Sequence, residues 1–172
     1  MSGKLLRLTA LRWAYILAIQ IFLLNNVLLG TYLNPYFYVL IVILFPLRIN
    51  PISSLLIAFI TGLLVDLMMS TAGIHAAALT ATAYLRIGLG NRIQRRNSDL
   101  QVVSIAEMGF SNFMVYAAIL CFVHHSLLFI LDSFRSDEIF FMMGRSLVSA
   151  SLSMILILLH ELFSQSGRRH VL

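Results

Sequence analysis

The sequence predicts an all-α, polytopic membrane protein, a single integral membrane domain of six transmembrane helices. Of its 172 residues 60% are hydrophobic and 11% charged, which is outside the range of soluble globular domains. The apolar residues form runs separated by short polar gaps, and six spans leave no room for a second domain in a chain of this length. The six expected spans cover residues 13–29, 36–47, 52–69, 74–89, 102–131 and 139–163.

The basic residues predict the orientation of these spans. When the runs are threaded as six crossings, ten of the 12 Lys and Arg residues fall on one side of the membrane: Lys4, Arg7, Arg12, Arg48, Arg86, Arg92, Arg95, Arg96, Arg168 and Arg169. Arg135 and Arg145 fall on the other side. Short loops beside spans retain excess Lys and Arg in the cytoplasm, so we expect both termini there. Because the charges flank spans without interleaved aromatic residues, we do not expect nucleic-acid binding.

The first expected span, 13–29, begins with Trp13 and Tyr15, aromatic residues that suit the membrane interface. Asn25 and Asn26 near its other end are polar enough to require partners. The N-terminus resembles the basic start of a signal sequence but has no small-residue cleavage site after the apolar run. We therefore expect an uncleaved first span.

The second expected span, 36–47, is short. Its residues would cover about 18 Å as a helix, less than the roughly 30 Å hydrocarbon core. It could be re-entrant, or it could begin near Tyr32. The charge pattern favours a crossing, because a re-entrant segment would place the basic residues Arg92, Arg95 and Arg96 outside the cell.

The third and fourth spans, 52–69 and 74–89, are joined by a turn of a few residues, which predicts an antiparallel hairpin. The main basic loop follows at 90–101. The fifth span, 102–131, has Ser98 as its expected N-cap.

The longer spans each carry one face of small and polar residues. Lipid tails are as apolar as leucine, so helices in membranes associate through such faces. Ala58, Gly62 and Asp66 form one stripe, and Ser146, Ser149, Ser153 and His160 belong to another. The stripes predict a compact bundle with a partly polar interior; a ligand cavity is the less favoured alternative.

Ionisable residues within spans are costly and need partners. Asp66 and Arg145 should share the outer leaflet, and we hypothesise that they pair. Alternatively, Asp66 could cap the next helix near His75. On the inner side, Glu107 and His160 are possible partners by the same argument.

The sequence has no pattern typical of a metal, cofactor or catalytic site. His124 and His125 are adjacent and point about 100° apart on a helix, so they cannot chelate one metal together. No serine lies in a nucleophile elbow, and there is no phosphate-binding glycine loop. A proton relay through Asp66 and a nearby histidine is a weaker alternative to a structural role. We therefore expect no enzyme activity, no metal and no cofactor.

The hairpin carries a resemblance to a known family. Its residues read Gly62-Leu63-Leu64-Val65-Asp66-Leu67 and then Gly73-Ile74-His75-Ala76, after a short run opened by Asn34-Pro35 and closed by Pro46-Leu47-Arg48. This pattern, over about Asn34 to Arg86, resembles the rod shape-determining protein MreD family of bacterial inner-membrane proteins. The positions that match are Gly62, Asp66, Gly73, His75 and Ala76, and the role the resemblance implies for them is to shape the hairpin.

The resemblance implies a non-enzymatic scaffold in the inner membrane. MreD-like proteins bind the single-span protein MreC and work with a glycosyltransferase, a transpeptidase and the actin-like MreB in cell elongation, which controls cell shape and lateral peptidoglycan synthesis. Their fold is similar to the substrate-binding component of energy-coupling-factor transporters. A small-molecule, vitamin-type transport component is therefore the alternative, with a cavity expected around Asn25, Asn26, Asp66 and Arg145.

Overall fold

Every regular element in the described part of the chain is a helix, which confirms the predicted all-α class. The computed structural model describes residues 3–26, 35–98, 100–133 and 139–169. Its helices are α1 (Gly3–Ala18), the π-helix η1 (Ile19–Leu23), the 3-10 helix η2 (Leu24–Asn26), α2 (Val39–Ile43), α3 (Pro51–Met69), α4 (Ile74–Arg96), α5 (Ile105–Met108), α6 (Phe110–Ser133) and α7 (Ile139–Arg169). Among them, three stretches are long and apolar enough to cross a membrane: Pro51–Met69, Phe110–Asp132 and Phe140–Ser164.

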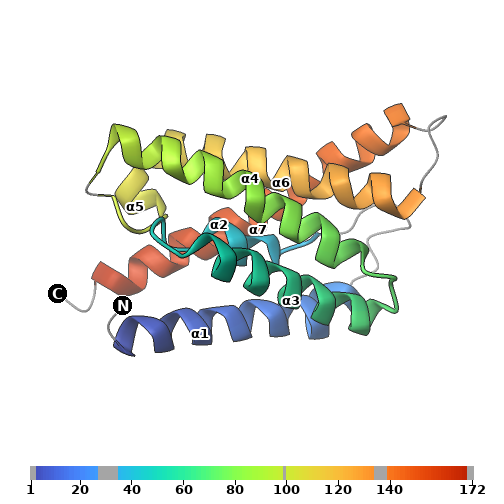
Figure 1. Ribbon diagram of the computed structural model, residues 1–172, viewed down its shortest axis with the longest axis horizontal. Coiled ribbons are helices and arrows are strands. Elements are labelled where there is room, and N and C mark those ends of the chain that lie inside the picture. The colour runs from blue at the N-terminus through green and yellow to red at the C-terminus, as the bar shows by residue number, and fades with distance from the viewer. Residues whose placement is uncertain (1–2, 27–34, 99, 134–138, 170–172) are drawn as a thin grey trace.

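The long helices lie side by side along one axis (Figure 1). The start of α1, the end of α4, α5 and the end of α7 lie at one end of the bundle, and the α3–α4 turn lies at the other. The C-terminal turns of α4 carry Arg92, Arg95 and Arg96. We call the end of the bundle where α4 ends the basic end. Helices α3 and α4 pack together, as do α4 with α6 and α6 with α7.

The second expected span, 36–47, contains only the short helix α2 at its centre. Five residues of helix rise about 8 Å, so α2 cannot cross a hydrocarbon core as a helix. Every residue from Tyr36 to Phe45 is buried, and α2 contacts α1, α3, α4 and α6. Irregular backbone is tolerated at membrane depth when protein encloses it, and here the bundle does so. We call residues 35–47 the central segment.

Side chains from distant helices satisfy the backbone of the central segment. Gln20 accepts from the Phe37 and Tyr38 N–H groups at 2.7 and 3.3 Å, and donates to the carbonyl of Pro35 at 3.3 Å. The Ser153 hydroxyl accepts from the Tyr36 N–H at 2.9 Å. Polar side chains on α7 and on the π-helix therefore replace the hydrogen bonds that a longer helix would make internally.

The other end of the central segment is held by α4 and α6. Arg86 donates through one nitrogen to the carbonyls of Phe45 and Pro46, the latter at 2.9 Å. Tyr116 donates to the Ile43 carbonyl at 3.3 Å. Arg86 is 1% exposed, so it lies inside the bundle, in the half of α4 that leads to the basic end.

The fifth expected span, 102–131, is interrupted. Helix α5 ends at Met108 and α6 begins at Phe110, with Gly109 between them at φ 77°, a backbone conformation that favours glycine. Ser104 caps α5 by accepting from the Glu107 N–H at 3.2 Å, so the expected cap at Ser98 was wrong. The long helix is therefore α6 alone.

Candidate functional site

The α3–α4 hairpin brings together five of the residues that the sequence singled out. A Cβ atom added at Gly62 would lie 2.4 Å from the Cα of Ala76 and 2.6 Å from the carbonyl oxygen of His75. Real Cβ atoms do not approach a backbone so closely, so the two helices can meet here only because residue 62 is glycine. The turn itself contains Gly73 at φ 85°.

Asp66 caps α4 from the neighbouring helix. Its Oδ1 accepts from the His75 N–H at 3.1 Å and from the Thr71 hydroxyl at 2.5 Å, and its Oδ2 accepts from the Ala76 N–H at 2.9 Å. A carboxylate at a helix N-terminus satisfies free N–H groups and complements the helix dipole. The capping alternative therefore describes the structure.

The proposed pairing of Asp66 with Arg145 was wrong. The Arg145 guanidinium carbon lies 4.3 Å from the ring centroid of Phe129, a cation–π geometry. Phe129 packs near Tyr36, and Tyr36 near His75, so a row of aromatic and imidazole rings separates the arginine from the hairpin.

Aromatic and histidine rings fill the core beside the hairpin. The Tyr38 hydroxyl and His124 Nε2 are 2.8 Å apart. His125 Nδ1 lies 2.8 Å from the Cys121 carbonyl, which can only accept, so Nδ1 carries the proton. His125 Nε2 then accepts from the Ser153 hydroxyl at 3.1 Å. This series of hydrogen bonds connects α6 to α7 and, through Ser153, to the central segment.

His75 is the least satisfied member of this core. It is 1% exposed, and neither ring nitrogen has a hydrogen-bond partner among the described atoms. Its ring centroid lies 5.3 Å from that of Tyr36 and 6.0 Å from that of Tyr38. A neutral imidazole has one donor and one acceptor, and an unsatisfied buried group costs about 1–3 kcal/mol. Within the described residues, no group of three or more His, Cys, Asp and Glu side chains is placed to hold a metal ion.

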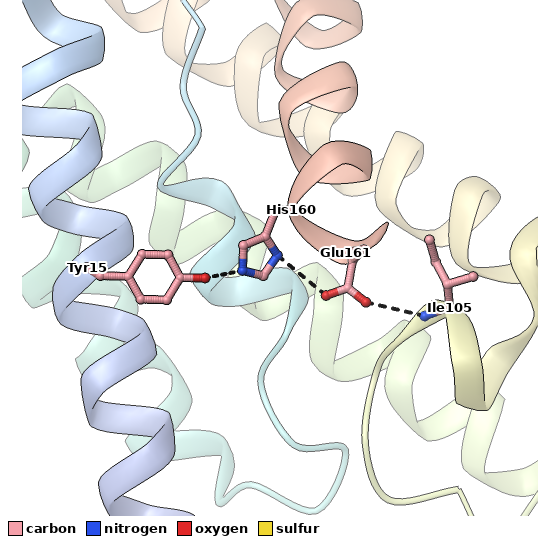
Figure 2. A network of polar contacts seen from close by, with 4 residues as sticks. All are labelled: Tyr15, Ile105, His160 and Glu161. Atoms are coloured by element: carbon pink, nitrogen blue, oxygen red, sulfur yellow. Dashed lines mark hydrogen bonds and ion pairs between the residues drawn. The ribbon is translucent and has the colours of Figure 1, made fainter. Parts of the chain in front are cut away.

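A polar network joins α1, α7 and α5 near the basic end (Figure 2). The Tyr15 hydroxyl and His160 Nε2 are hydrogen-bonded, and His160 Nδ1 lies 3.6 Å from Glu161 Oε1. The other Glu161 oxygen accepts from the Ile105 N–H at 3.4 Å. The phenol thus fixes the imidazole through a hydrogen bond, while the carboxylate lies at ion-pair distance from its other nitrogen.

The expected partnership of Glu107 with His160 was wrong. Glu107 is exposed, whereas the carboxylate beside the imidazole is Glu161, which is 3% exposed. Glu161 follows His160 directly in the sequence, and its place inside the sixth predicted span was a signal that it needed a partner. Gln20 and Arg86 also lie inside predicted spans, which likewise indicated that each needed a partner.

The Tyr15–His160 contact lies in a groove between α1 and α7, the α1–α7 groove, of about 530 Å³. Arg12, Tyr15 and His160 supply polar atoms to it. Leu23 and Phe163 are among its apolar walls, and both are more than half exposed. The groove therefore combines apolar walls with a few polar groups, the kinds of contact through which helices associate in a membrane.

No protein-family model matches the chain, and no curated protein or solved structure shows significant similarity to it. The three long apolar helices are typical of a membrane protein.

Proposed function

We propose that this protein is a non-enzymatic scaffold of the bacterial cell-elongation complex, an MreD-like protein of the inner membrane that binds an MreC-like single-span partner. The observation that carries the proposal is the hairpin. All five residues of the resemblance meet there, and their contacts are those of helix packing and capping. That is the role the resemblance implies for them.

The proposed topology has six crossings, with the basic end in the cytoplasm and a fold similar to the substrate-binding component of energy-coupling-factor transporters. The central segment makes the second crossing inside the bundle, where its backbone is satisfied by Gln20, Ser153, Arg86 and Tyr116. The charge asymmetry supports this orientation, because Arg92, Arg95 and Arg96 lie at the end where α1 begins and α7 ends.

The α1–α7 groove is the proposed docking place for the partner's span. The side chain of His160 retains 12% exposure, and Arg12 and Tyr15 face the same groove. Polar groups that face hydrocarbon are costly, so a partner helix with a hydrogen-bonding residue would stabilise them. By holding this partner beside the transpeptidase, glycosyltransferase and MreB-linked components, the scaffold would help control cell shape and lateral peptidoglycan synthesis.

The proposal is tested by depletion and complementation in a rod-shaped cell that carries the protein. Depletion is expected to give round cells. Leu23→Trp fills the groove and should fail to restore rods although the protein accumulates in the membrane. Leu56→Trp is the matched control, because Leu56 is 55% exposed on α3, against 59% for Leu23. Normal rods after complete depletion would contradict the proposal.

The second candidate, a vitamin-type transport component, is favoured by His75. Its two buried ring nitrogens have no hydrogen-bond partner among the described atoms, and the polar atoms of a small ligand would supply one. A ligand that co-purifies with the wild-type protein and is lost on His75→Phe, identified by mass spectrometry, would favour this function over the scaffold.

A further inference from the structure

A second groove lies between α4 and α6 at the basic end, with a volume of about 450 Å³. This volume is within the roughly 300–1,000 Å³ typical of ligand sites. Its polar side chains include Arg92, Arg96 and Glu107, and its apolar walls include Leu89 and Ile119. We call it the α4–α6 groove.

The charged residues that line this groove lie at the basic end, and Asn112 and Tyr116 add polar atoms from α6. Helix α4 ends at the basic end and α6 begins there, so Arg96 and Glu107 lie at the mouth while Leu89 and Ile119 lie deeper. From Arg96 to Leu89 the helix rises about 10 Å. Along the bundle axis the charged side chains thus give way over this distance to uncharged and mostly apolar ones.

The charges at the mouth match one phosphodiester. Arg92 and Arg96 are one helical turn apart and therefore share a face of α4. With Glu107 they leave a net charge of +1, opposite to the single negative charge of a phosphodiester. Guanidinium groups bind phosphate oxygens through paired N–H donors.

The groove is open along α6, on the outer surface of the bundle. Val115 and Ile119 are 59% and 41% exposed, and both line the groove from α6. Basic pockets between transmembrane helices on the cytoplasmic side suit anionic lipid headgroups.

We propose that the α4–α6 groove binds one anionic phospholipid. Arg92 and Arg96 hold its phosphate at the mouth. One acyl chain follows Leu89 and Ile119 toward the middle of the bundle. The proposal requires the bundle to lie in a membrane with the headgroups of one leaflet at the basic end, and it is independent of the scaffold function.

The test is native mass spectrometry of the full chain in detergent, titrated with phosphatidylglycerol or with phosphatidylcholine of the same acyl chains. Phosphatidylglycerol should bind more tightly. Arg92→Gln and Arg96→Gln should each weaken its binding about five-fold, because a basic side chain near a lipid headgroup contributes about 1 kcal/mol. Glu107→Gln should tighten binding, since it removes a negative charge from the mouth.

Arg95→Gln is the matched control. It removes the same charge from the same turn of α4, and Arg95 is exposed without lining the groove, so it should leave the affinity nearly unchanged. An equal loss on Arg95→Gln would show a diffuse surface field and overturn the site. Equal binding of the two lipids would also overturn it. If inorganic phosphate displaced phosphatidylglycerol at a concentration similar to that of the lipid, the ligand would be a free ion and not a lipid.

Discussion

The α3–α4 hairpin and the central segment both place backbone N–H and C=O groups inside an apolar bundle, and they satisfy them differently. In the hairpin, Asp66 reaches the N–H groups of His75 and Ala76, nine and ten residues along the chain. In the central segment, Ser153 reaches the N–H of Tyr36 across 117 residues. The hairpin is thus specified by neighbouring sequence, while the central segment depends on the whole bundle.

The largest effect is expected at Gly62. Gly62→Ala would push a Cβ atom to 2.4 Å from the Ala76 backbone, which must separate the two helices. We expect a loss of more than about 3 kcal/mol in the free energy of unfolding, measured by denaturing-detergent titration. A Cβ at Gly88, also in α4, meets no described atom within 4 Å, so Gly88→Ala should be neutral or stabilising. Equal losses would refute the close approach.

Arg86 tests the central segment most strongly. Arg86→Met keeps the length of the side chain but leaves the Phe45 and Pro46 carbonyls without their donor. We expect a loss of about 2–3 kcal/mol in the same titration. Arg95→Met makes the same change at an exposed position of the same helix and should cost less than about 0.5 kcal/mol. If Arg86→Met were as stable as wild type, the segment would not depend on α4.

Asp66 tests the hairpin in the way that Arg86 tests the central segment. Asp66→Ala removes the acceptor for two buried N–H groups and should cost about 2 kcal/mol. Asp132→Ala, at an exposed position near the end of α6, is the control. The double variant Asp66→Arg with Arg145→Asp should be no more stable than either single variant, because Asp66 caps α4. Rescue by the exchange would restore the ion-pair hypothesis.

The smallest effect is expected at Tyr116. Tyr116→Phe removes a single hydrogen bond to the Ile43 carbonyl at 3.3 Å. Interhelical hydrogen bonds in membrane proteins average about 0.6 kcal/mol, so unfolding should shift by about that amount. Tyr84→Phe, 73% exposed on α4, is the control and should leave the unfolding midpoint unchanged. A loss as large as that of Arg86→Met would mean that the segment is anchored mainly from α6.

The same contrast explains what could be predicted from the sequence. The hairpin was predictable because Gly62, Asp66 and Gly73 follow one another at helical and turn spacing, and their contacts are local. The helical class followed from composition. The break at Gly109 was missed because glycine is tolerated within apolar helices, and its positive φ is set by tertiary structure.

The central segment could be predicted only in part. Its apolar residues indicated a short element, but the partners of its backbone lie on four other helices, 17 to 117 residues away in the sequence. Isolated polar residues within apolar runs, such as Gln20 and Arg86, indicated that buried groups needed hydrogen-bond partners. The sequence did not indicate which groups these were. The Tyr15–His160–Glu161 network was missed for the same reason, since α1 and α7 are separated by most of the chain.

The proposed function requires that the chain crosses a membrane with its basic end in the cytoplasm. Labelling of single introduced cysteines with a membrane-impermeant maleimide tests it most directly, and the native Cys121 is 0% exposed and should not interfere. Ala72→Cys, in the exposed α3–α4 turn, should react in intact cells, while Asn97→Cys, at the end of α4, should react only after the membrane is opened. Reaction of Asn97→Cys in intact cells would contradict the proposed orientation and the scaffold function that depends on it.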